Sequence, residues 1–455
     1  MHVAGLTLAP FHAVRYQPRR VRDLAAVTSP PYDVVVRPDG QRRLEIAEPH
    51  NVVRLILPQD HDHAAAGARL RHWRATGVLT ADPRPGLYVY EQRTAGAGVL
   101  QRGLLGALAL TPPAAGVVLP HESVLPEVVD ERASLMRATH ANLEPLLLAY
   151  RGDPSGPVAA AVERAVAGRP LLATTTADGV NHRIWPIHDP AEQAAVNAEL
   201  ARHRALIADG HHRWATALRL AAEHGGRPPW DRTLVLLVDT ARHPLRVQAI
   251  HRVLPWLTPA AALRRLDGAF RATPVPGPAE RALARLAAAE GPALLLTDGD
   301  AFHLLDRPSP QLLARTVPRD RPARWRELDA TVLHAALLDD LWRPEATDPA
   351  DPIDPTGATG ATGATHGARA ADGAGGGRGA TVRYLHDAPS ALAQAQQLGG
   401  SAVLLRPVPE ATVRELAEVG VVMPQKSTSF GPKPASGLVL RDLADEEPGR
   451  IAGES

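Results

Sequence analysis

The residues best suited to chemistry form a short polar segment after an apolar run that ends at Ala208. In order they are Asp209, Gly210, His211, His212 and Arg213. Glycine permits the backbone of a tight turn, and residues 214–222 have helical spacing, so the segment predicts a strand, a turn and a helix. The first N–H groups of a helix lack partners within it, and the helix dipole adds about half a positive charge there. We therefore interpret the segment as a phosphate-binding turn.

In this interpretation the amides from Gly210 onward hold phosphate groups, and the side chains of His211, His212 and Arg213 offset the phosphate charge. Asp209 holds a magnesium ion or takes a proton from the acceptor. A simpler alternative makes Asp209 the N-cap of the helix, with solvated histidine and arginine side chains behind it. The motif alone does not separate the two interpretations, so the other candidate residues have to decide.

A second candidate pair, His121 and Glu122, follows the apolar residues 117–119. Side chains at the end of a strand are held rigidly beside a cleft in many folds that mix helices and strands. Glu122 is therefore the main candidate for a general base or for a magnesium ligand. A histidine in such a place is more often a hydrogen-bonded structural residue, so His121 ranks below Glu122 as a catalytic candidate.

The chain contains 50 basic side chains of Lys and Arg, and only Lys426 and Lys433 are lysines. An ammonium is more compact than the planar guanidinium, so its restriction to one segment favours a function there. Ser427 and Thr428 lie beside Lys426, but the glycine-rich run that precedes the lysine of a Walker A sequence is missing. We expect residues 422–434 to form a second anion-binding loop, with Lys426 closing over the transferred group. A solvent-exposed turn is the alternative.

The composition excludes several classes of function. Hydrophobic residues make up 45% and charged residues 22%, as in ordinary globular proteins. The formal net charge of +1 gives no reason to expect a nucleic-acid or membrane surface. No apolar run approaches the roughly 18 residues of a membrane span, and the N-terminus lacks the charged start of a signal peptide, so we expect a cytoplasmic protein. With no cysteine, disulfides, thiolate metal sites and sulfur nucleophiles are excluded.

Apolar runs and helical segments together predict a mixed α/β (α+β) fold, in which helices cover several sheets. Residues 344–380 are rich in glycine, alanine and threonine and cannot bury a core, so we expect a flexible insert there. The expected segments are an N-terminal α/β region at 1–150, a central α/β region with the polar turn at 151–343, the insert at 344–380, a smaller C-terminal β-α-β-α-β unit at 381–446 and a tail at 447–455.

Three local patterns give further expectations. The apolar and β-branched residues 51–57 predict a strand. Residues 86–92 and 101–110 are expected to pair around a glycine-containing turn, and residues 293–297 and 301–305 around Asp298, Gly299 and Asp300.

An ordered set of motifs resembles the bacterial and archaeal "domain of unknown function 1015" family. The motifs lie at residues 30–34, 88–92, 120–122, 209–213, 251–254 and 423–428, and together they span nearly the whole chain apart from the insert. Because that family has no settled activity, the resemblance implies relatives but no reaction.

The turn at 209–213 is also similar to the nucleotide-binding turn of the ParB/sulfiredoxin superfamily, which implies a ParB/sulfiredoxin-like nucleotide-binding core. Sulfiredoxins need a catalytic cysteine, which this chain lacks. ParB proteins usually carry Glu-Arg-Arg after the glycine and attach a basic DNA-reading domain, whereas this chain has His211, His212 and Arg213 and no such domain. The free-serine-kinase form, with Asp-Gly-His before the arginine, is the most similar. His212 replaces a small hydroxyl residue, which leaves the bound nucleotide open.

The leading hypothesis is a magnesium-dependent phosphotransferase, similar to a serine kinase, or a nucleotide hydrolase. It would use ATP or ADP and act on a small metabolite. One alternative is a nucleotide-responsive binding module without catalysis. A second is a metal-dependent hydrolase that uses His121, Glu122, His211 and His212; neighbouring helical residues point about 100° apart, which is unfavourable for chelation. The leading hypothesis requires Lys426 and Arg213 to lie close together.

Overall fold

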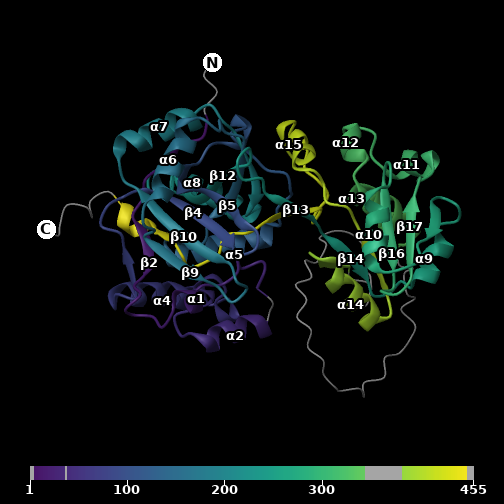
Figure 1. The fold of residues 1–455 in the computed structure, drawn as a ribbon, viewed down its shortest axis with the longest axis horizontal. Helices are drawn as coiled ribbons and strands as arrows, with labels where there is room; N and C mark the ends of the chain where they lie inside the picture. The colour runs from purple at the N-terminus through teal and green to yellow at the C-terminus, as the bar shows by residue number, and fades with distance from the viewer. Residues whose placement is uncertain (1–4, 36–37, 344–381, 448–455) are drawn as a thin grey trace. The chain divides into compact units, whose positions relative to one another are not determined.

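The computed structural model describes residues 5–35, 38–343 and 382–447 (Figure 1). The chain divides into two compact units. The first unit contains Met1–Arg246 and Phe430–Ser455, and the second contains Val247–Ser429. These units do not coincide with the segments expected from the sequence, because the chain leaves the first unit at 246 and returns to it at 430. The expected insert lies outside the described residues, as does all of the expected tail beyond residue 447.

A mixed sheet forms the centre of the first unit, which confirms the expected α/β class. Its strand order is β6-β11-β8-β12-β5-β4-β10-β9, and β1 pairs with β5. The pairs β11/β6 and β12/β8 are parallel, and the other pairs are antiparallel. The strands are β1 (Leu8–Ala9), β4 (Leu87–Thr94), β5 (Gly98–Ala109), β6 (Val118–Leu119), β8 (Leu146–Tyr150), β9 (Leu172–Thr175), β10 (Asn181–Ile187), β11 (Ala205–Asp209) and β12 (Arg232–Asp239). The pairing of β4 with β5 confirms the first expected hairpin.

Helices pack on this sheet and on one another. Apolar residues of α6 (Pro157–Ala167) and α7 (Pro190–Leu200) share a core with strands β8, β11 and β12. The helix α5 (Pro126–Thr139) packs against both α4 (His63–Ala75) and α8 (His211–Glu223). Helix α8 follows β11 after one residue, so its N-terminus lies at the end of that strand.

A smaller sheet of the first unit joins segments that are distant in sequence. Its order is β3 (Leu79–Ala81), β2 (Ala13–Tyr16), β21 (Leu440–Asp442) and β7 (Ala141–Asn142). The purple N-terminal helices lie together beside it in Figure 1. Figure 1 labels α1 (Leu24–Val27), α2 (Asp39–Ala47) and α4 there. The short helix α3 (Val53–Ile56) packs against α4. Helix α3 shows that the strand predicted at 51–57 is wrong, because Asn51 Oδ1 accepts the Val53 N–H and starts a helical turn whose residues enter a buried core.

The second unit is built on one antiparallel sheet in the order β15-β17-β16-β19-β14-β18. Its strands are β14 (His251–Leu254), β15 (Arg271–Pro274), β16 (Ala293–Thr297), β17 (Phe302–Asp306), β18 (Arg383–Leu385) and β19 (Ser401–Leu404). The β16/β17 pair confirms the second expected hairpin. Strands β18 and β19 join this sheet, whereas β21 joins the first unit, so residues 381–446 contribute to both units.

The helices of the second unit are short. They are α9 (Pro259–Arg265), α10 (Ala279–Ala287), α11 (Pro310–Thr316), α12 (Ala323–Arg326), α13 (Asp329–Val332), a π-helix (Leu333–Leu341), α14 (Ala388–Leu398) and α15 (Glu410–Glu418). The chain passes between the units through β13 (Arg246–Ala249) and β20 (Thr428–Gly431). Among the described residues, no helix combines the length and apolar character needed to cross a bilayer.

Candidate functional site

The polar segment at 209–213 has the predicted strand-turn-helix structure. Strand β11 ends at Asp209, Gly210 has φ +98°, and α8 begins at His211. A Cβ atom at position 210 would lie 3.1 Å from Nε of Arg213, so glycine serves both the backbone angle and the close approach. Gly210 is itself the N-cap residue, and no side chain caps the helix. The alternative in which Asp209 is the N-cap is therefore wrong.

The Asp209 carboxylate instead binds two cations. Its Oδ2 accepts a hydrogen bond from Arg213 Nη2 at 2.5 Å, and its Oδ1 lies 2.6 Å from Lys433 Nζ. Lys433 also donates to Asp33 Oδ2. Burial lowers the pKa of Lys433, but the carboxylates of Asp209 and Asp33 outweigh that effect and raise it. Lys433 is therefore a charged group held between two carboxylates.

Lys433 is held in place by polar side chains of the central sheet. Gln101 Nε2 donates to Pro432 O at 2.8 Å, and Gln92 Nε2 donates to Lys433 O at 3.0 Å. The Tyr90 hydroxyl accepts the Ala435 N–H at 3.2 Å. These side chains come from β4 and β5, so the sheet fixes the backbone on both sides of the lysine.

Asp33 comes from the Pro-Pro loop near the N-terminus. Pro31 O accepts the Val34 N–H at 2.9 Å, so the loop is a turn. The Tyr32 N–H donates to Glu144 Oε1 at 3.1 Å, and Ser436 Oγ donates to the same oxygen at 2.7 Å. Glu144 thus joins the N-terminal loop to the segment that carries Lys433. Asp33 was not among the candidate site residues; its signals in the sequence are the stiff Pro-Pro entry and the family motif at 30–34.

Two guanidinium groups lie against the ring of Tyr32. The Cζ atom of Arg132 is 4.5 Å from the ring centroid, and that of Arg213 is 5.8 Å away. Arg213 Nη1 also donates to Pro145 O at 2.7 Å. Burial lowers the pKa of Arg213, but Asp209 and neighbouring carboxylates outweigh that effect and raise it, so this side chain stays charged. Arg213 is firmly held and acts as a fixed charge.

The histidines of the turn contact the segment that follows β6. His211 Nε2 accepts the His121 N–H at 3.2 Å, and His212 Nε2 accepts the Leu125 N–H at 3.0 Å. The edge of the His121 ring meets the His211 ring with centroids 4.5 Å apart, and Glu122 Oε2 lies 3.9 Å from His211 Nδ1. Burial lowers the pKa of His121, so its ring is neutral near pH 7. The two motifs predicted as sites are therefore neighbours.

The four residues of the metal-hydrolase alternative do not gather their ligand atoms. Within the described residues, His121, Glu122, His211 and His212 form no group of three or more metal-ligating side chains close enough to share an ion. The Nε2 atoms of His211 and His212 already accept backbone N–H groups. The geometry therefore gives this alternative no support.

Lys426 belongs to the second unit, whereas Asp209 and Arg213 belong to the first. Lys426 has φ +55° and follows Gln425, whose carbonyl accepts from Arg252 Nη2 at 3.2 Å. Ser427 is buried and its hydroxyl donates to Pro424 O, and Thr428 begins β20. Convergence of Lys426 with Arg213 stays a prediction, while Lys433 of the same loop contacts Asp209 directly.

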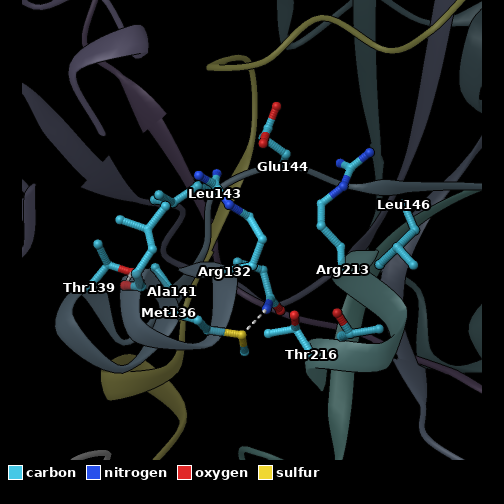
Figure 2. Close-up of a pocket in the computed structure, with 12 residues that line it drawn as sticks. Arg132, Met136, Thr139, Ala141, Leu143, Glu144, Leu146, Arg213 and Thr216 are labelled. Atoms are coloured by element: carbon cyan, nitrogen blue, oxygen red, sulfur yellow. Dashed lines mark hydrogen bonds between the residues drawn. The ribbon is translucent and has the colours of Figure 1, made fainter. Parts of the chain in front are cut away.

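Arg213 and Glu144 also line a cavity of about 60 Å³. Figure 2 shows Met136 and Thr139 of α5 on one side and Arg213 and Thr216 of α8 on the other, with Glu144 near its upper end. Binding pockets for whole ligands usually have about 300 Å³ or more. This cavity is therefore large enough for a few waters or a small group, and a nucleotide would have to bind outside it.

A family model described as "Protein of unknown function (DUF1015)" matches residues 8–331. The chain belongs to this family. The DUF1015 match includes the motifs at 120–122 and 209–213 and ends before Lys426 and Lys433. No curated protein matches the chain.

Several solved structures resemble this DUF1015 protein at low identity. A free serine kinase in complex with AMP has a TM-score of 0.33 and 14% identity, over 69% of this chain and 84% of that one. A mutant of the free serine kinase in complex with ADP has a TM-score of 0.33 and 13% identity, again over 69% of this chain and 84% of that one. "SbnI with C-terminal truncation from Staphylococcus aureus" has a TM-score of 0.35 and 10% identity, over 76% of this chain and 91% of that one. At these scores the similarities establish no activity for this chain.

Proposed function

We propose that the first unit binds a nucleotide such as ATP or ADP at the turn 209–213. The bound nucleotide either phosphorylates a small metabolite or is hydrolysed. The observation that carries this proposal is the position of Lys433, whose Nζ lies 2.6 Å from Asp209 and contacts Asp33 beside the N-terminus of α8. A charged lysine, a fixed arginine and the N-terminus of a helix are the usual partners of phosphate groups.

Asp33 and Asp209 have different environments and hence different proposed roles. The Asp209 side chain is 11% exposed and both of its oxygens contact cations, so it orients Arg213 and Lys433. The Asp33 side chain is 32% exposed and is accessible to an acceptor hydroxyl. We assign Asp33 as a candidate general base, alongside Glu122 from the sequence-based hypothesis.

The four charged side chains Lys433, Arg213, Asp33 and Asp209 favour a magnesium ion beside a bound nucleotide. Lys433 and Arg213 are balanced by Asp33 and Asp209, so these side chains alone leave little positive charge for a nucleotide. Magnesium is commonly held by one or two carboxylates together with the phosphates and waters. Asp209 and Glu122 are the proposed ligands, and a bound magnesium ion would offset the charge of the phosphate groups.

The chemistry in this proposal depends on positioning and charge compensation. Phosphoryl transfer needs the acceptor oxygen in line with the leaving group and positive charge around the transferring phosphoryl group. Arg213 is fixed by Asp209 and Pro145, so it presents its charge without reorganisation. His211 and His212 hold the segment at 121–125 against α8 and act as positioning residues.

The experiment is a titration of the full chain with ATP, ADP, AMP, GTP and CTP, each with and without magnesium, followed by a search for phosphorylated or hydrolysed product. Binding with product supports the phosphotransferase or hydrolase. Binding without product, unchanged in Glu122→Gln and Asp33→Asn, identifies the alternative of a nucleotide-responsive module. No binding of any nucleotide contradicts both.

A further inference from the structure

Two histidines and one glutamate form a cluster on the surface of the first unit, built from elements that the proposed function does not use. His61 ends the short 3-10 helix Gln59–His61, His63 begins α4, and Glu131 lies on α5. One potential ligand atom from each residue lies within 4.8 Å of the others. It is the one group of this kind found within the described residues.

The backbone holds the two histidines in place. Asp60 and His61 have φ +52° and +56°, in the left-handed region that residues with a Cβ seldom adopt. The Asp62 side chain accepts the Ala65 N–H at 2.9 Å and caps α4. This turn presents His61 and His63 on the same side of the chain, toward α5.

The third member of the cluster is held by its neighbour on α5. Arg132 Nη2 donates to Glu131 Oε1 at 2.5 Å, and His61 Nδ1 lies 3.2 Å from the same oxygen. An outer hydrogen bond from arginine orients this carboxylate as such bonds orient metal ligands.

His63 supplies a nitrogen that nothing else uses. Its Nε2 is buried and has no hydrogen-bond partner among the described residues. His63 therefore has a nitrogen that is not committed to a hydrogen bond, and one of its two ring nitrogens lies within 4.8 Å of the ligand atoms of His61 and Glu131.

We propose that His61, His63 and Glu131 bind a zinc ion that ties the start of α4 to α5. Two imidazoles and one carboxylate suit zinc, and water would complete the tetrahedral shell. Ligand distances near 2.1 Å require the ligand atoms to lie about 3.4 Å apart in that geometry. The His61 side chain is 64% exposed and can rotate to close the remaining gap. Magnesium, which prefers oxygen ligands, does not suit the set.

The test is a competition between the full chain, stripped of metal with a chelator, and a chromophoric zinc indicator. The wild type is expected to bind one zinc ion tightly, with a Kd of micromolar or lower, and to unfold about 5 °C higher with zinc in excess. His61→Ala and His63→Ala each weaken this binding at least tenfold. His72→Ala removes an exposed histidine of α4 and leaves zinc binding unchanged.

Three results would overturn the proposal. One is a wild type that takes up zinc no more tightly than the His61→Ala/His63→Ala double variant. Another is a loss of binding in His72→Ala as large as that in His63→Ala. The third is displacement of zinc by millimolar magnesium. Circular dichroism of each variant confirms that the fold is intact, since a surface histidine contributes little to the core.

Discussion

The Nζ atom of Lys433 lies 2.6 Å from Oδ1 of Asp209, although the two residues come from opposite halves of the sequence. Asp209 is the last residue of strand β11, and the side chains of Gln92 and Gln101 hold the backbone at Pro432 and Lys433. The contact brings together the polar turn and the lysine-containing segment. Lys433 thus lies at the polar turn, while the convergence of Lys426 with Arg213 stays a prediction.

Replacement of Lys433 by methionine tests this ion pair as a structural element. The change leaves Asp209 and Asp33 near each other without their shared cation, so the free energy of unfolding should fall by about 2 kcal/mol, less than for a fully buried pair because Asp33 is partly exposed. Urea unfolding measures the loss. Lys426→Met is the matched control at an exposed lysine and should change stability by less than about 0.5 kcal/mol. Equal effects of the two substitutions would contradict the assignment.

Asp33→Asn tests the candidate general base. Loss of a general base typically lowers the rate by about 100-fold or more, so kcat should fall by that order while the nucleotide Kd changes little. Asp39→Asn, at the exposed start of α2, provides a control that should keep full activity. If Asp33→Asn retains the wild-type kcat, Asp33 is not the base.

Gly210→Ala tests the geometry of the turn. A Cβ here meets Arg213 at 3.1 Å and also requires a left-handed backbone at φ +98°. The substitution should lower the free energy of unfolding by about 2 kcal/mol and weaken nucleotide binding. Gly179→Ala separates the causes, because Gly179 has φ +79° but open space around its Cα, so it should cost about 1 kcal/mol and leave binding unchanged. Wild-type affinity in Gly210→Ala would exclude the turn as the phosphate site.

His182 makes the stability of the first unit depend on pH. Burial lowers the pKa of His182 to about 4, and its ring contacts the hydroxyls of Tyr90 and Thr176. The unfolded chain binds this proton near pH 6.5 but the folded chain does not, so stability is full above pH 6.5 and falls toward pH 4. The loss should approach about 3 kcal/mol at the low end of this window.

Urea unfolding at pH 7.5 and pH 5 measures this dependence. In His182→Gln the difference between the two pH values should shrink relative to the wild type. In His72→Ala, which removes an exposed histidine, the difference should persist. An unchanged difference in His182→Gln would show that another group carries it.

The local structure of the site could be predicted because it depends on local chemistry. The apolar run before Asp209, the glycine and the helical spacing after it determine a strand, a turn and a helix without reference to the rest of the chain. The same holds for the β4/β5 hairpin. Neighbours within a few residues are enough to establish these elements.

The contacts that complete the site could not be predicted in the same way. The ion pairs of Lys433 with Asp33 and Asp209 join three distant segments of the chain. The order of strands in two sheets brings these segments together, and no local pattern reveals that order. Residues 53–56 resemble a strand but form a helix, since packing of Val53, Leu55 and Ile56 against α4 and the small sheet overrides the preference of the β-branched residues. The family resemblance indicated which motifs belong together but not that Lys433 contacts Asp209.

The most direct test of the central claim is a calorimetric titration of ATP with magnesium into the wild type, Lys433→Ala and Lys426→Ala. Saturable binding to the wild type is expected, with a loss of at least tenfold in affinity for Lys433→Ala, because removal of the lysine leaves two carboxylates at the phosphate site. Wild-type affinity in Lys433→Ala, or no binding by any of the three proteins, would contradict it.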